Sequence, residues 1–172
     1  MVWFSKEKLE ITDKLDINKY REDLINLYHK YFIYLNGYDK MDAFLKVTET
    51  EIDKYLDKNI YEYAENYKSA VKFVNSLNNK DKYLCIYKND SLVGIVRFKE
   101  TKTYIRIYEL ISNSKMYDKV LKYFETNYQV KKIYLEIPIN DIKLLVLSSK
   151  MGYLEDNKDM DDNKKYIVNK EL

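Results

Sequence analysis

A chain of 172 residues is long enough to bury its own core and short for two domains, so we expect a single domain over residues 1–172. Lys and Arg total 30 against 28 Asp and Glu, and this net charge of +2 lacks the basic excess of a dedicated nucleic-acid surface. One cysteine allows neither an internal disulfide nor a cysteine metal site, and no apolar stretch matches a secretory signal or a membrane span. We therefore expect a cytoplasmic protein with no nucleic-acid, membrane or metal partner.

The first part of the chain predicts a short strand followed by helices. Residues 9–11 fit a strand, and residues 17–35 carry apolar side chains at helical spacing. Asp16 is placed to cap this helix and Gly37 to end it. A capping box at Thr48–Glu51 predicts the start of a second helix.

Strand patterns follow a further helical stripe. Residues 63–77 continue the helical spacing. Residues 83–87 and 92–98 read as two strands of a hairpin, joined by a turn over residues 88–91. Residues 103–111 are rich in Tyr, Ile and Leu and predict another strand.

Strands and helices alternate in the remaining chain. We expect a helix over residues 116–127, a strand over 133–138, a helix over 141–151, and final strands over 153–155 and 165–168. The complete order is β-α-α-β-β-β-α-β-α-β-β. It predicts an α/β (α+β) fold: a mixed, mostly antiparallel sheet of about seven strands with helices on both faces.

Tyrosine is abundant, with 19 residues interspersed with Lys and Asn. Aromatic rings among basic side chains are typical of proteins that stack nucleic-acid bases. The alternative is that tyrosine takes the place of Phe and Leu in a Lys-, Asn- and Ile-rich chain. We favour this alternative because the tyrosines fall on helical and strand patterns alike, without clustering.

Three features that can signal chemistry have simpler explanations. His29, the single histidine, is expected to be a surface or boundary residue of the first helix. Cys85 alternates onto a core face and is expected to be a buried apolar residue. The acidic turn over residues 156–163 lacks the spacing and the glycine of an EF-hand, so we expect a solvated hairpin turn.

Three local motifs in this order carry a family resemblance. They are the hairpin Asn89–Ile95 with its internal glycine, the strand and helix of residues 103–127, and the segment Leu147–Tyr153. Together they resemble the GCN5-related N-acetyltransferase (GNAT) family, best over residues 81–156. The resemblance implies an acyl-CoA-dependent N-acyltransferase that uses acetyl-CoA as co-substrate and transfers the acetyl group directly to a small-molecule or protein amine. It also implies a possible homodimer. The alternative is a catalytically inactive or repurposed member that binds a ligand or partner.

The resemblance assigns coenzyme A binding to the fourth strand and the loop that follows it. In the family this loop follows the pattern Gln/Arg-x-x-Gly-x-Gly/Ala, and its N–H groups hold the pyrophosphate at a helix N-terminus. The equivalent residues 112–117 contain no glycine, so side-chain donors would have to contribute. The residues that the resemblance implies for coenzyme A binding are Leu110, Ile111, Ser112, Asn113, Ser114, Lys115, Met116, Tyr117 and Asn140.

Glu109 is the leading candidate for the general base. It lies among apolar strand residues, an environment that can tune a carboxylate for proton transfer. The alternative is a structural Glu109, on the solvent face or paired with Arg97 or Arg106, and strand alternation permits the Arg97 pair. Glu136 on the fifth strand ranks second for the same chemical reason.

Ser148 occupies the position at which many family members carry the tyrosine that protonates the leaving thiolate. We therefore name Ser148 as the candidate acid implied by the resemblance. Serine is shorter and a much poorer acid than tyrosine. Tyr153 and Tyr117 are the alternatives for this role.

Overall fold

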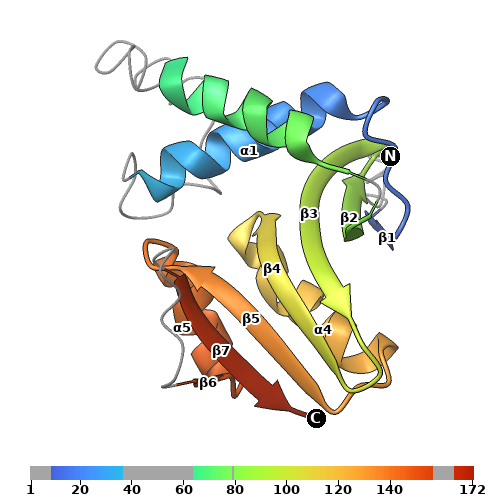
Figure 1. Ribbon diagram of the computed structural model, residues 1–172, viewed down its shortest axis with the longest axis vertical. Helices are drawn as coiled ribbons and strands as arrows, with labels where there is room; N and C mark the ends of the chain where they lie inside the picture. Colours follow the sequence, from blue (N-terminus) through green and yellow to red (C-terminus); the bar gives the residue numbers. More distant parts are fainter. Residues whose placement is uncertain (1–8, 37–63, 79, 157–164) are drawn as a thin grey trace, which may run out of the picture.

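The computed structural model describes residues 9–36, 64–78, 80–156 and 165–172. These residues form a seven-stranded sheet with helices on both faces, as the sequence predicts (Figure 1). The strand order is β1-β2-β3-β4-β5-β7-β6, and β4 and β5 are the one parallel pair among the described strands. The elements are β1 (Leu9–Thr12), α1 (Arg21–Leu35), the helical residues 64–76, β2 (Lys82–Lys88), β3 (Ser91–Glu100), β4 (Tyr104–Ser112), the 3-10 turn η1 (Ser114–Met116), α4 (Tyr117–Asn127), β5 (Lys132–Pro138), α5 (Ile142–Lys150), β6 (Leu154–Glu155) and β7 (Lys165–Glu171).

A tight turn joins β2 to β3. Asn89 and Asp90 both have positive φ, 50° and 66°, which is the backbone of a two-residue type I′ turn. Asn and Asp tolerate this left-handed region better than other non-glycine residues do. The turn therefore sets the hairpin that the sequence predicts over residues 83–98.

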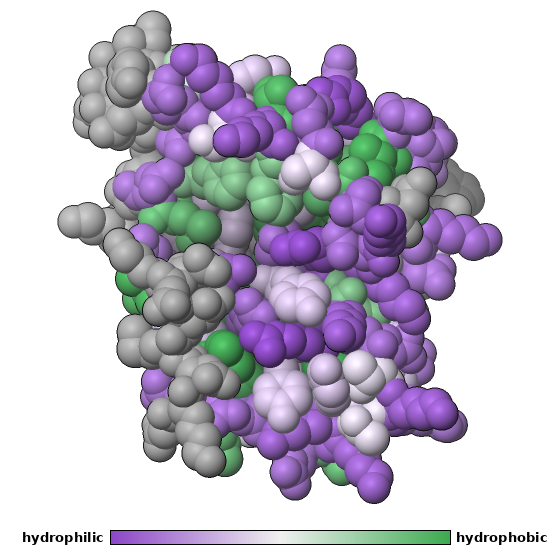
Figure 2. Space-filling model, in the orientation of Figure 1, coloured by the Kyte–Doolittle hydropathy of each residue, from purple (hydrophilic) through white to green (hydrophobic). Residues whose placement is uncertain are grey.

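One face of the sheet is covered by α1 and the helical residues 64–76. Their apolar side chains pack on alternate residues of β2, β3 and β4. Figure 2 shows a mostly hydrophilic surface on this view, and its broadest green area lies in the upper half, where these helices lie. The buried members of this layer are Leu24, Ile25, Leu27, Tyr28, Tyr31, Tyr34, Ala70, Val74, Tyr83, Cys85, Tyr87, Leu92, Ile95 and Ile111.

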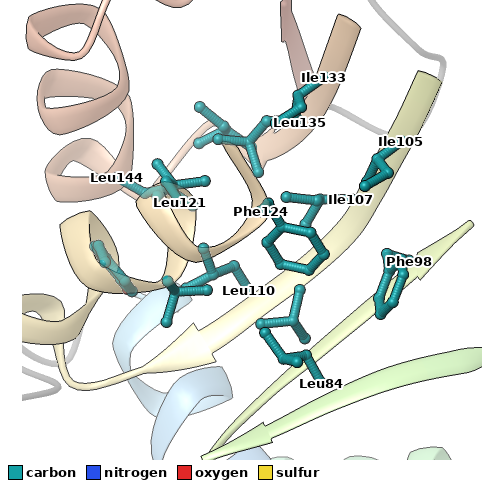
Figure 3. Packing of buried hydrophobic residues seen from close by; sticks show 14 of the residues in the cluster. Leu84, Phe98, Ile105, Ile107, Leu110, Leu121, Phe124, Ile133, Leu135 and Leu144 are labelled. Carbon is teal, nitrogen blue, oxygen red and sulfur yellow. The ribbon is translucent and has the colours of Figure 1, made fainter. Parts of the chain in front are cut away.

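The opposite face is covered by α4 and α5. Figure 3 shows side chains of α4 directed at those of β4 and β5, with Phe124 near Ile107. The ring of Phe124 also stacks against Tyr128 and lies edge-on to Phe98, at centroid distances of 5.3 and 5.0 Å. Both faces of the central strands are thus buried, which accounts for their continuous apolar runs.

Two predictions about the first helix are wrong. The helix begins at Arg21 rather than near residue 17, because Asp16 closes a separate turn: its carboxylate accepts from the N–H of Lys19 at 3.0 Å. His29 is buried, only 4% exposed, rather than at the surface, because the helical residues 64–76 lie against α1 on that side. Its ring meets the Tyr67 ring edge-on at 5.3 Å.

The prediction for Cys85 is confirmed, and three other predictions fall on residues that the structure does not describe. The fully buried Cys85 confirms the expected core residue, and burial raises the pKa of its thiol to about 12. The predicted helix stop at Gly37, the capping box at Thr48–Glu51 and most of the acidic turn after Asp156 lie outside the described residues.

Candidate functional site

Strands β4 and β5 separate halfway along their length. Their parallel pairing runs from Tyr104 opposite Lys132 to Ile107 opposite Leu135 and goes no further. On its other side, β4 has a bulge at the same point: Ile107 and Glu109 pair with consecutive residues of β3, so Tyr108 is the extra residue. Figure 1 shows the two ribbons diverging toward α1.

The divergence leaves one edge of β4 without a partner among the described strands. Beyond Ile107, no described strand pairs with the backbone N–H and C=O groups on the edge of β4 that faces β5. One of them is satisfied by a side chain: the ammonium of Lys165 donates to the Tyr108 carbonyl at 3.3 Å. Lys165 stands opposite Pro138 at the beginning of β7, so its side chain reaches across the end of β5. An incoming ligand would find both donors and acceptors along this edge.

A small cavity lies where these strand ends meet α1. Its volume is about 170 Å³, and most of its lining is aromatic or aliphatic. Glu109 and Lys165 are the two charged residues among those that line it. The lining residues are Tyr28, Tyr31, Phe32, Leu35, Phe73, Tyr108, Glu109, Ile111, Pro138 and Lys165.

Glu109 lies at the wall of this cavity with a side chain that is 14% exposed. Its Oε1 accepts from Arg97 Nη2 at 2.8 Å, and its Oε2 accepts from the Tyr28 hydroxyl at 3.2 Å. The pairing with Arg97 that the strand alternation permits is therefore present. Arg106 pairs instead with the buried Glu136, at 2.7 Å. A substrate amine at Glu109 would share the carboxylate with two existing donors.

A buried cluster of three tyrosines and one aspartate fills the space between the two helical layers. Asp141, fully buried, caps α5 by accepting from the Leu144 N–H at 3.2 Å. Its carboxylate also accepts from the hydroxyls of Tyr31, Tyr34 and Tyr117, at 3.2, 3.3 and 3.4 Å. Because these tyrosines come from α1 and α4, on opposite faces of the sheet, the cluster joins the two layers where the sheet is open.

Burial shifts the proton affinities in this cluster. Desolvation raises the pKa of Asp141 above its ordinary value, although the hydrogen bonds it accepts act in the opposite direction. Desolvation, followed by the nearby Asp141 carboxylate, raises the pKa of Tyr31 and Tyr117 well above the usual tyrosine value. Tyr31 also lines the cavity, so the cluster and the cavity share a side chain.

The sequence did not reveal the tyrosine–aspartate cluster. The tyrosines show no clustering in the sequence, yet three of them converge on one carboxylate. The signals that were present are a helix-capping position at Asp141 and a spacing of three residues between Tyr31 and Tyr34, which puts both on one side of α1.

The loop after β4, which lacks the glycines of the family pattern, forms a 3-10 turn. Asn113 begins this turn: its side chain accepts from the Lys115 N–H at 2.9 Å, and its carbonyl accepts from the Met116 N–H at 2.8 Å. Among the described residues, the non-glycine positions with positive φ are both in the β2–β3 turn, so the loop avoids that strain. Met116 occupies the cap position of α4 without a side-chain hydrogen bond, so Ser112, Asn113 and Ser114 do not cap this helix. Among the described residues no side chain caps α4, so an anion could still approach the N-terminus of this helix.

The other predicted site residues lie around the opening but have structural partners. Leu110 and Ile111 are buried on the part of β4 beyond its pairing with β5. Ser148 is buried in α5, and its hydroxyl donates to the Leu145 carbonyl at 2.9 Å. Asn140 donates to the Leu35 carbonyl at 2.8 Å and ties the β5–α5 loop to the end of α1.

Ser112 and the alternative acid Tyr153 complete the set. The buried Ser112 donates to the Asn113 carbonyl at 3.1 Å, while the Tyr153 hydroxyl donates to Glu125 at 3.2 Å. Over the described ranges, no group of three or more His, Cys, Asp and Glu could hold a metal ion. No described helix has the length and apolar character to cross a membrane.

Several solved structures with the same architecture are named as acetyltransferases. The PaiA N-acetyltransferase of Thermoplasma acidophilum, in complex with coenzyme A, matches with a TM-score of 0.55 and 15% identity over 96% of this chain and 99% of that one. An acetyltransferase from Streptococcus agalactiae matches with a TM-score of 0.54 and 14% identity, over 95% of this chain and 98% of that one. A GNAT-family acetyltransferase from Staphylococcus aureus matches with a TM-score of 0.52 and 16% identity, over 96% of this chain and 99% of that one. No model of a known family and no curated protein matches the sequence. At these identities the likeness establishes the fold.

Proposed function

We propose, from the premise that this chain has the GNAT acetyltransferase fold, that it is an acyl-CoA-dependent N-acyltransferase acting on a primary amine. The observation that carries the proposal is the opening between β4 and β5, which begins at Ile107 and Leu135 beside the bulge at Tyr108. A ligand arm laid along the free edge of β4 would complete the hydrogen bonding that the missing strand leaves open. Acetyl-CoA is the acyl donor that the fold suggests.

The residues around the opening supply the groups that acyl transfer needs. Backbone N–H groups on the free edge of β4 can polarise a thioester carbonyl. Glu109 faces the adjoining cavity and is the base that we assign to the attacking amine. The N-terminus of α4, which no described side chain caps, suits the pyrophosphate of coenzyme A. For the proton that the leaving thiolate takes up, Ser148 and Tyr117 remain the candidates.

A second candidate function is a binding protein of the same fold without turnover. It is favoured because the candidate catalytic groups already make hydrogen bonds within the protein. The Glu109 carboxylate accepts from Arg97 and Tyr28, and the Tyr117 hydroxyl donates to Asp141. Such a protein would bind a ligand in the opening and release it unchanged. Binding and turnover therefore have to be measured separately.

Calorimetric titration with acetyl-CoA, followed by an assay of thiol release with a panel of primary amines, tests the proposal. We expect saturable binding, competition by coenzyme A, and thiol release that requires an amine. Glu109→Gln should lower turnover at least tenfold while the affinity for acetyl-CoA stays within twofold. Glu100→Gln, a change at an exposed carboxylate paired with Lys82, is the matched control. If no heat of binding is measured at millimolar acetyl-CoA, the acyltransferase proposal is refuted. Binding of acetyl-CoA without thiol release would favour the second function.

A further inference from the structure

We infer that the cavity beside Glu109 accepts a primary amine carried on a single aromatic ring or a similarly compact apolar group, and does not accept an extended polyamine. The inference rests on the proposed acyl transfer, because it names the acceptor class for that reaction. Three properties of the cavity carry it: its volume, its lining and the distribution of charge on its wall.

The volume of the cavity matches one ring. It measures about 170 Å³, and a cavity of about 150 Å³ in another protein is large enough to hold benzene. A second ring or a long chain would have to extend into the opening between the strands. The size therefore selects a compact group.

The lining of the cavity is aromatic on several sides. Rings of Tyr28, Tyr31, Phe32, Phe73 and Tyr108 border it. The Tyr28 and Phe73 rings lie 4.5 Å apart at a tilt of 37°, and Phe73 and Phe32 meet edge-on at 6.1 Å. These rings already pack on one another in tilted and edge-on arrangements, the geometries in which a further aromatic ring is also bound favourably.

The charge on the wall fixes where the amine lies. Glu109 is the one carboxylate among the described residues that line the cavity, and an ammonium beside it would also lie close to aromatic rings, whose faces attract cations. The one cation among the described lining residues, Lys165, is held by the Tyr108 carbonyl at 3.3 Å and lies 3.9 Å from Glu136. A polyamine would bring a second ammonium against apolar walls, where the described lining offers no second carboxylate to pair it, and such a burial is costly.

Two larger hollows of the molecule have the opposite character. One of about 620 Å³ and one of about 310 Å³ lie along β1 and β2, and charged side chains such as Asp13, Lys14 and Asp81 line them. Neither borders the part of β4 that diverges from β5. A further hollow, of about 290 Å³, reaches Asn113 in the loop after β4 and has charged side chains in its lining, Asp23 and Lys30. Glu109, the proposed base, lines the small aromatic cavity.

Calorimetric titration of 2-phenylethylamine and of spermidine at pH 7 tests the inference, with and without saturating coenzyme A. We expect 2-phenylethylamine to bind at least tenfold more tightly than spermidine. Glu109→Gln, which removes the charge, and Leu35→Trp, which fills the cavity, should each weaken 2-phenylethylamine roughly tenfold or more. The matched controls are Glu100→Gln and Leu172→Trp, at exposed positions outside the cavity lining.

Two results would overturn the inference: tighter binding of spermidine, or 2-phenylethylamine affinity that neither cavity variant changes. Failure of 2-phenylethylamine to bind at millimolar concentration in both conditions would overturn it as well. Acetyl-CoA is titrated into the same samples as a separate arm. Its failure to bind would remove the acyltransferase proposal, whereas the amine titrations decide the cavity's ligand class.

Discussion

At the scale of single residues, Asp141 holds together parts of the chain that are far apart. Its carboxylate accepts from three tyrosine hydroxyls and from the first turn of α5, all within the protein interior. We predict that Asp141→Ala lowers the free energy of unfolding by roughly 2–4 kcal/mol, because buried hydroxyls lose their acceptor. Urea denaturation measures this loss. Asp13→Ala, at an exposed aspartate, should stay within about 0.5 kcal/mol of the wild type, and equal effects of the two variants would contradict the role of Asp141.

The same carboxylate predicts a pH dependence. Burial raises the pKa of Asp141 in the folded protein above the ordinary value of 3.8 that it regains on unfolding. Between those two values the folded state keeps the proton and the unfolded state loses it, so rising pH favours unfolding. We predict that the wild type loses stability relative to Asp141→Asn, which cannot ionise, as the pH rises upward from about 3.8. Denaturation of both proteins between pH 3 and 8 checks the trend, and a difference that is flat or grows in the wild type's favour would contradict it.

The pairing of Glu109 with Arg97 could be anticipated from the sequence, but the Asp141 cluster could not. Arg97 and Glu109 lie on adjacent strands of a hairpin-like pair, where alternation limits the possible partners. The hydroxyls of Tyr31 and Tyr34 approach Asp141 across 110 and 107 residues of sequence. Such contacts depend on how the two helical layers are placed on the sheet, which no local pattern encodes.

At the scale of elements, the close approach of β2, β3 and β4 depends on Gly94. A Cβ atom at this position would come within 2.8 Å of Ile86 Cδ1, 2.9 Å of Ser112 Cβ and 3.2 Å of the Ile111 carbonyl oxygen. We predict that Gly94→Ala destabilises the protein by about 1–3 kcal/mol through overpacking, measured by thermal or urea unfolding. Adding Ser112→Gly should recover part of the lost stability, because it removes the Ser112 Cβ atom that the new Cβ would meet.

Gly152 provides a contrasting control for that prediction. Its φ is +89°, but a Cβ there would meet only Lys170 Cε, at 3.8 Å. Gly152→Ala should therefore cost about 1 kcal/mol from backbone strain alone, and Ser112→Gly should not relieve it. Rescue of both alanine variants by Ser112→Gly would show that the clash at Gly94 is not the cause.

Element boundaries followed from the sequence where local chemistry fixes them. Alternating apolar residues and the Asn89-Asp90 turn specify the β2–β3 hairpin, and Asp141 caps α5 as its position before an apolar run suggests. The start of α1 was misplaced, because Asp16 is equally suited to closing a turn. The start of α4 lies within one residue of the predicted position, at Tyr117, and Asn113 caps the 3-10 turn that precedes the helix.

At the scale of the whole molecule, the order of strands creates the candidate site. Placing β5 beside β4 in parallel, and β7 on the far side of β5, leaves the ends of β4 and β5 free to separate under α1. The mixed sheet followed from the order of elements and the family resemblance. The bulge at Tyr108 and the aromatic cavity did not, because both arise from pairing between distant segments.

Hydrogen exchange of the backbone amides, with and without saturating acetyl-CoA, tests most directly whether the opening between β4 and β5 is the acyl-CoA site. We predict slower exchange in residues 108–112 and in the first turn of α4, where a bound ligand would satisfy the free N–H groups. Exchange in β1, at the opposite edge of the sheet, should not change. Unchanged exchange in residues 108–112 at saturating acetyl-CoA, or protection confined to other strands, would contradict the assignment.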